Sequence, residues 1–161
     1  MALLDEEVVE YWLNNKGFFC MRGVKSGLGE IDFLAVRPSE KELECWQVEV
    51  TVSFRPIGYI GGGSNAKRRD VSDVELGVEQ YIEKKFTSEK MIAKRNEILP
   101  NVHWKYILVC AEVRHDIELK LFEQKGVRVH RYKDILRELG NSKSQVNSTA
   151  GNIVEILRYL Q

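Results

Sequence analysis

The sequence lacks the features that mark membrane, secreted and thiolate-metal proteins. No apolar run approaches the ~20 residues that a membrane span needs. Residues 1–12, MALLDEEVVEYW, have neither the basic start nor the long apolar centre of a signal peptide. The three cysteines, Cys20, Cys45 and Cys110, lie in separate apolar runs without a CxxC or Cys/His metal spacing. We therefore expect a cytoplasmic protein with buried thiols and no membrane partner.

An excess of charge of either sign is also missing, because Lys and Arg total 24 and Asp and Glu total 24. This balance argues against a histone-like protein that binds nucleic acid through bulk charge, although a local basic patch would suffice. Residues 55–69, RPIGYIGGGSNAKRR, form such a patch with four basic residues and no acidic one. Length and a hydrophobic content of 43% predict a single folded domain over residues 1–161.

Hydrophobic periodicity and turn residues predict the order of the elements along the chain. Helices are expected over residues 5–15, 71–86, 88–99, 116–126, 133–140 and 152–160. Strands are expected over residues 18–22, 30–36, 43–52, 104–113 and 127–132, with a turn over residues 23–29. A meander followed by crossover units, in the order αβββαα-βαβα, predicts an α/β fold: a mixed β-sheet flanked by helices.

Two of the predicted strands carry carboxylates that we expect to meet. Side chains alternate along a strand, so Glu49 shares one side of its strand with Gln47 and Thr51. If residues 30–36 and 43–52 pair through the short link between them, Asp32 faces Glu49. Two such carboxylates repel unless they are protonated, separated by water or share a cation, and oxygen ligands suit Mg²⁺, Mn²⁺ or Ca²⁺. The alternative is a pair of surface carboxylates beside an exposed sheet face.

The segments NNKGFFCMRGVKSGLGEIDFLAV (14–36) and CWQVEVTVS (45–53) resemble the PD-(D/E)XK nuclease superfamily, particularly archaeal Holliday-junction resolvases and RecB-like nucleases. Those proteins share a helix, a GF strand, a Gly/Ser turn, an aspartate strand and a strand reading Glu-x-Lys. The resemblance implies a restriction-endonuclease-like fold and a nuclease that uses Mg²⁺ or Mn²⁺. It also implies that Asp32, Glu49 and the carbonyl of Val50 bind the metal.

Thr51 departs from the superfamily pattern, because a lysine usually stands at this position. That lysine positions the attacking water and offsets developing negative charge, which an uncharged hydroxyl cannot do. Some superfamily members carry other residues here. A lysine from elsewhere is one replacement, with Lys25 and Lys67 as candidates. A shifted register that makes Gln47 and Glu49 the strand pair is the other.

The superfamily often adds an acid from the first helix. At 100° per residue, Asp5 lies in line with the apolar stripe of residues 5–15, Glu6 at its margin and Glu7 opposite. Asp5 is therefore the candidate for a further metal ligand. The alternative is that Asp5 is the helix N-cap.

The glycine-rich stretch at residues 55–69 is the candidate for contact with nucleic acid. Lys67, Arg68 and Arg69 would bind phosphates, and Tyr59 would stack on a base. Gly58 and residues 61–63 would let backbone amides approach phosphates. The alternative is a solvated charge run without a ligand.

The favoured function is a divalent-metal-dependent nuclease that hydrolyses phosphodiester bonds, with DNA as the expected nucleic acid and a homodimer as the assembly that many relatives form. A catalytically degenerate domain, which keeps the fold to bind nucleic acid or a partner protein, is the first alternative. A structural subunit without metal is the second. The absence of a lysine at position 51 is the feature that favours the first alternative over the nuclease.

Overall fold

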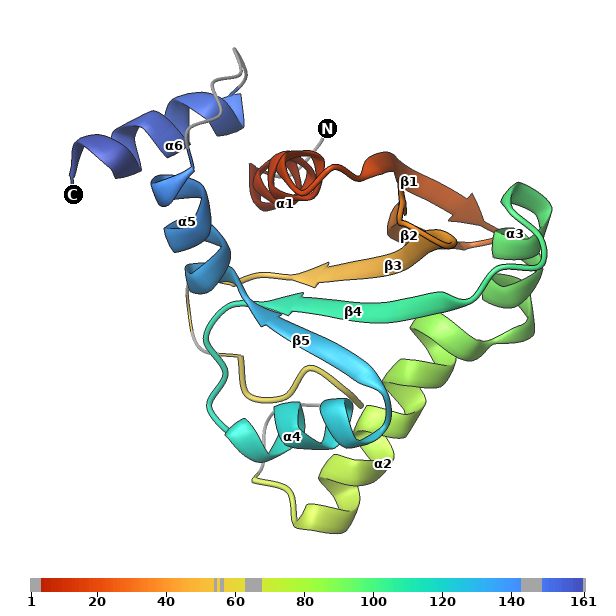
Figure 1. Cartoon of the computed structure of the whole chain (residues 1–161). Helices are drawn as coiled ribbons and strands as arrows, with labels where there is room; N and C mark the ends of the chain where they lie inside the picture. Colours follow the sequence, from red (N-terminus) through yellow and green to blue (C-terminus); the bar gives the residue numbers. More distant parts are fainter. Residues whose placement is uncertain (1–3, 54, 56, 63–67, 143–148, 161) are drawn as a thin grey trace.

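The computed structural model describes residues 4–53, 55, 57–62, 68–142 and 149–160, which include a five-stranded sheet in the order β1-β2-β3-β4-β5 (Figure 1). Its strands are β1 (Phe19–Ser26), β2 (Gly29–Pro38), β3 (Leu43–Thr51), β4 (Trp104–Cys110) and β5 (Val127–Arg131). The first three strands pair antiparallel, whereas β3, β4 and β5 pair parallel. The sheet is therefore mixed, as the sequence predicts.

The helical elements follow the predicted order along the chain. They are α1 (Leu4–Asn15), α2 (Val71–Ile82), the π-helical turn η1 (Glu83–Thr87), α3 (Glu89–Ile98), α4 (Asp116–Gln124), α5 (Tyr132–Asn141) and α6 (Thr149–Tyr159). Together with the strands they confirm the predicted α/β fold class, and the described elements run in the order αβββαα-βαβα with one further helix, α6, at the end.

One face of the sheet is covered by α1, α5 and α6 (Figure 1). The apolar stripe of α1 is buried here, with Trp12 against Trp46 of β3 at a ring-centroid distance of 6.2 Å. Ile135 of α5 and Val154 of α6 complete this core. Burial of these apolar side chains against the sheet is the main stabilising contribution on this face.

The opposite face is covered by α2, η1, α3 and α4 (Figure 1). Met91 of α3 packs over β1 and β2 beside Val24, whereas Phe86 of η1 and Phe122 of α4 pack over β4 and β5. The η1 turn on this side lies over the carboxyl end of β3, where Glu49 is located, and the candidate site forms between them.

Several boundaries differ from those that the sequence predicts, and two of the differences lie beside the candidate site. The strand expected over residues 18–22 continues as β1 to Ser26, so the link to β2 is limited to Gly27 and Leu28. Gly23 lies within β1 with a positive φ of 65°, where its neighbours pair with Phe33 and Ile31 across the ladder. The glycine is therefore used inside the strand, across from Asp32, because a side chain at that φ would be strained.

The helix expected over residues 71–86 is interrupted. Regular α-helix ends at Ile82, and η1 follows before α3 begins at Glu89. Single π-helical turns of this kind are frequent at functional sites because they redirect the side chains that follow. Among the described helices, none is both long and apolar enough to cross a membrane.

Candidate functional site

Asp32 and Glu49 are brought together by the antiparallel pairing of β2 with β3. The register pairs Phe33 with Val48, so Asp32 and Glu49 occupy the next position of the two strands. Oδ2 of Asp32 accepts a hydrogen bond from the backbone N–H of Val50 at 2.7 Å. The hairpin therefore holds Asp32 against the residue that follows Glu49.

The Glu49 carboxylate is fully buried, with 0% of the residue exposed. Burial and the negative charge of Asp32 raise the pKa of Glu49 to about 7, against the lowering effect of Lys85 and Gln47. Burial also raises the pKa of Asp32, although the Val50 N–H and the charge of Lys85 oppose this shift. Both acids are thus in an environment that disfavours their charge and that a nearby cation would stabilise.

Such a cation comes from η1. Nζ of Lys85 lies 2.8 Å from Oε2 of Glu49. Burial would lower the pKa of Lys85, but the attraction of Glu49 and Asp32 outweighs it and the pKa is raised. The ammonium is therefore charged, paired with Glu49 and within the field of Asp32.

Lys85 was not among the sequence candidates for this role, although the sequence carried a signal. Residues 78, 81 and 85 share one side of a helix, so Lys85 falls on the apolar stripe of Val78 and Tyr81. A lysine on a buried stripe is uncommon unless it is paired. Of the two lysines that the sequence favoured, Lys25 is exposed and pairs with Glu30, and Lys67 lies outside the described residues.

Thr51 and Gln47 each contact a side chain of the helices that cover this face. The hydroxyl of Thr51 lies 3.2 Å from the hydroxyl of Tyr81, so this residue faces α2. Gln47 lies beside Glu49 on the strand, but its Oε1 accepts a hydrogen bond from Arg95. The amide oxygen therefore accepts from Arg95 in this structure, and a role for Gln47 in a shifted register stays a prediction.

The acids of α1 lie near Asp32. Asp5 is in the first turn of the helix, which begins at Leu4 among the described residues, and its charge contributes to the raised pKa of Asp32. Burial and the charge of Asp32 raise the pKa of Glu6. Asp5 and Glu6 therefore extend the negative field around Asp32, and the sequence pattern alone had placed Glu6 at the margin.

Of the described residues in this segment that were expected to contact nucleic acid, Tyr59 and Arg69 pack into the fold, whereas Arg68 is exposed. Tyr59 is only 6% exposed, its ring stacks on His115 at 5.1 Å, and the guanidinium of Arg69 covers it at 4.5 Å. This tyrosine is therefore part of the protein interior and does not offer a free ring to a base. Arg69 is tied to the carbonyl of Gly61 at 2.6 Å, whereas Arg68 is exposed.

The glycines of this segment also serve the fold. The backbone amides of Ile60 and Gly61 donate to the buried carboxylate of Glu118 at 2.8 Å each. A Cβ on Gly61 would lie 2.3 Å from the carbonyl oxygen of Gly77, so two backbone segments cross here at close range. These amides are thus occupied by a side chain of α4, and Gly63 lies outside the described residues.

Two cavities adjoin Lys85. One of about 640 Å³ lies between the β1–β2 turn and η1, and one of about 260 Å³ lies between Ile60 and Tyr81. Both are lined by Lys84 and Lys85. Lys85 therefore borders two separate cavities.

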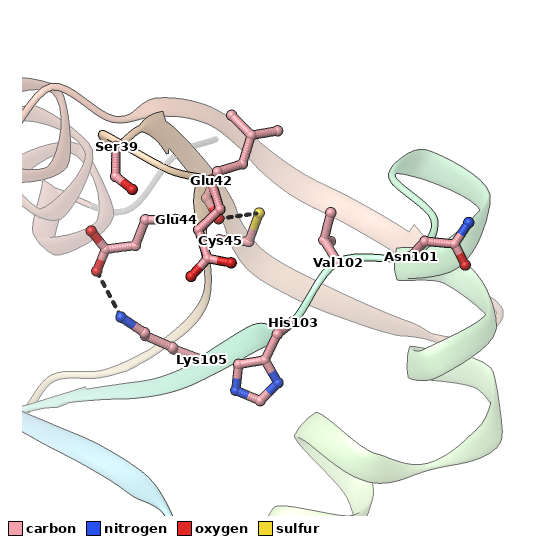
Figure 2. A pocket seen from close by; sticks show the side chains of 9 residues that line it. Ser39, Glu42, Glu44, Cys45, Asn101, Val102, His103 and Lys105 are labelled. Atoms are coloured by element: carbon pink, nitrogen blue, oxygen red, sulfur yellow. Dashed lines mark hydrogen bonds and ion pairs between the residues drawn. The ribbon is translucent and has the colours of Figure 1, made fainter.

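A third cavity, of about 290 Å³, lies at the other end of β3 and β4 (Figure 2). Here Nζ of Lys105 donates to Oε1 of Glu44 at 3.1 Å, and His103 and Asn101 lie along the opposite wall. None of the site residues predicted from the sequence lines this cavity.

The carboxylate oxygens near Lys85 are of the type that hard divalent cations prefer. Asp32 and Glu49 supply oxygen ligands, and a shared cation would relieve the repulsion between them. Within the described ranges, no group of three or more His, Cys, Asp and Glu residues is arranged to hold a metal. The available protein ligands are thus two carboxylates and the expected carbonyl of Val50, and Mg²⁺ commonly keeps several waters in such sites.

No protein-family model, curated protein or solved structure matches the chain. The function is therefore inferred from the geometry of Asp32, Glu49 and Lys85.

Proposed function

We propose that this protein is a divalent-metal-dependent nuclease, with a restriction-endonuclease-like fold of the PD-(D/E)XK superfamily, that hydrolyses phosphodiester bonds of DNA. The observation that carries the proposal is the ion pair of 2.8 Å between Lys85 and Glu49, next to Asp32. It supplies the positive charge that Thr51 lacks. Two acids and one lysine are the side chains that the superfamily resemblance requires.

Each residue has a role in the proposed reaction. A Mg²⁺ or Mn²⁺ ion bound by Asp32 and Glu49 would supply the Lewis-acid chemistry that activates water and polarises the phosphate. The ammonium of Lys85 would donate a hydrogen bond to the attacking water or to a phosphate oxygen, and would offset negative charge as it grows. The N–H of Val50 keeps Asp32 oriented at 2.7 Å.

The test is cleavage of supercoiled plasmid DNA in Mg²⁺ and then in Mn²⁺, with Asp32→Asn and Lys85→Met beside the wild type. Removing the ammonium should lower the rate by about 100- to 1,000-fold, the effect of losing one pre-positioned donor. Lys94→Met is the matched control, because Lys94 is 27% exposed in its side chain and Lys85 28%, and each pairs with a glutamate. Wild-type cleavage that survives Asp32→Asn would refute the proposal.

A second candidate is a degenerate nuclease-fold domain that binds nucleic acid or a partner protein without cleavage. The contact between Thr51 and Tyr81 favours it, because the strand position that usually carries the catalytic lysine faces the half-buried ring of a tyrosine. On this alternative no variant and no metal produces cleavage, and Asp32→Asn leaves nucleic-acid affinity unchanged.

A further inference from the structure

Gln47 holds both members of the ion pair at the candidate site. Its side chain is fully buried, and Nε2 donates to Oε1 of Glu49 at 3.1 Å and to the backbone carbonyl of Lys85 at 2.7 Å. One amide group therefore contacts the strand that carries the carboxylate and the turn that carries the ammonium.

The orientation of this amide is determined by its neighbours. Oε1 of Gln47 accepts from Nη1 of Arg95, and a guanidinium has donors only. The groups on the other side, the Glu49 carboxylate and the Lys85 carbonyl, are acceptors. Only one of the two amide orientations satisfies all three contacts, so Arg95 fixes which way the amide points.

Arg95 is itself buried, with 4% of the residue exposed. Its Nη1 also donates to the carbonyl of Phe86 at 2.6 Å, and Nη2 donates to the hydroxyl of Tyr106 at 3.2 Å. Burying a guanidinium among neutral acceptors costs free energy, whereas an apolar side chain of similar size would fill the space without that cost. What the guanidinium adds is a rigid fork that ties Gln47 to the turn.

We propose that Arg95 is a positioning residue, which acts through Gln47 to fix the Glu49 carboxylate and the Lys85 ammonium relative to each other. The role rests on the proposed nuclease function, since it serves the same site. The fork holds the carbonyl of Phe86, and the amide holds the adjacent carbonyl of Lys85. The turn and the end of β3 are thus joined by one continuous set of hydrogen bonds, which pre-organises the reacting groups.

Gln47→Glu separates positioning from stability. The new carboxylate would repel Glu49 and the Lys85 carbonyl, but its ion pair with Arg95 would offset this cost, so the net change in stability should be small. We expect the melting temperature to stay within a few degrees and kcat to fall by about 10- to 100-fold, as for groups that orient metal ligands, with KM changed less than about threefold. A purely structural role predicts no loss of kcat in a variant of unchanged stability.

Arg95→Lys tests the hydrogen bonds that Arg95 makes to Gln47 and to the turn. A lysine keeps the positive charge but loses the planar guanidinium that donates to several acceptors at once. The readout independent of cleavage is hydrogen exchange of the Gln47 side-chain amide by NMR. Its protection should fall by about tenfold or more in Arg95→Lys. Arg37→Lys is the control, because Arg37 also bridges a side chain, that of Glu44, and a backbone carbonyl, that of Lys16. This variant should leave the exchange of the Gln47 amide unchanged.

The outcomes separate the two proposals. Unchanged protection of the Gln47 amide in Arg95→Lys, or full kcat in Gln47→Glu, overturns the positioning role and leaves the nuclease function standing. Absence of cleavage by the wild type overturns the nuclease function, and the positioning role for catalysis falls with it, whatever the amide exchange shows. Loss of kcat by the same factor in Arg37→Lys would assign the effect to general destabilisation and also overturn the positioning role.

Discussion

Nζ of Lys85 lies 2.8 Å from Oε2 of Glu49, with the ammonium supplied by a π-helical turn and the carboxylate by the end of a central strand. The predictions on cleavage, pH dependence and metal binding all depend on this ion pair. Its carboxylate is buried beside a second acid, Asp32, so that charge, metal binding and stability are coupled at one place.

The proposed role of Lys85 in the η1 turn should be filled in part by a lysine placed at position 51 of β3. Lys85→Met is expected to lose cleavage, and adding Thr51→Lys should restore part of it, because position 51 is the usual place of this charge in the superfamily. Thr51→Lys alone should not raise cleavage, since a second ammonium would crowd Tyr81 and repel Lys85. Plasmid-cleavage rates of the four proteins decide this, and a faster single Thr51→Lys variant would contradict the assigned role of Lys85.

Glu49 should make the metal-free protein less stable at alkaline than at acid pH, whereas His130, whose pKa is lowered by burial, acts in the opposite direction. The pKa of Glu49 is raised from 4.5 to about 7 by burial and by Asp32, so its folded state favours the protonated form. That contribution is complete below the unfolded pKa and is lost as pH rises through about 7. Urea titrations should give a free energy of unfolding lower by on the order of 2 kcal/mol at about pH 8 than at about pH 5.

Glu49→Gln should flatten this profile, whereas Glu97→Gln, at an exposed glutamate that pairs with Lys94, should keep it. Burial also raises the pKa of Asp32, so Asp32→Asn should reduce the slope in the same direction. The pKa of Lys85 is raised above 10.5 and does not contribute within this range. A wild-type profile that rises toward alkaline pH would show that Glu49 is not held as described.

Divalent metal should stabilise the protein through the two acids. At a concentration of Mn²⁺ 100 times its Kd, the gain is about 2.7 kcal/mol, which calorimetry or thermal melting detects. Asp32→Asn should abolish the gain and raise the melting temperature of the metal-free protein, because it removes like-charge repulsion. Asp134→Asn, which alters an exposed ion pair with Arg137, is the control that should keep the full response.

The two adjacent arginines Arg68 and Arg69 should differ in what they support. Arg69→Ala removes the hydrogen bond to Gly61 and the contact with Tyr59, and should destabilise the protein by about 1–2 kcal/mol. Arg68→Ala should leave stability unchanged and reduce the salt dependence of DNA binding by ~0.9 if it contacts one phosphate. Denaturation and binding isotherms at several salt concentrations measure both, and an unchanged slope would assign Arg68 to solvent.

Local sequence predicted the fold class and the two acids. Hydrophobic periodicity gave the order of helices and strands because each element buries one face against the sheet. The meeting of Asp32 with Glu49 was also predictable, since a short hairpin link sets the register and alternation sets the facing side chains. Glycine content misled at residues 23–29, where Gly23 lies inside β1 with positive φ.

Only the tertiary structure decided which lysine stands beside the acids and what the glycine-rich segment does. In the sequence, Lys85 falls on the apolar stripe of its predicted helix. Its position beside Glu49 depends on the end of the regular helix at Ile82 and on the hydrogen bonds of Gln47 and Arg95. Tyr59 lay in a stretch whose composition indicated an exposed loop, yet it is buried against His115 and Arg69. The neighbouring Gly61 is held by Glu118 of α4 and lies against Gly77 of α2. The partners in both cases are far apart in the chain, and local composition carries no information about which distant element a segment will contact.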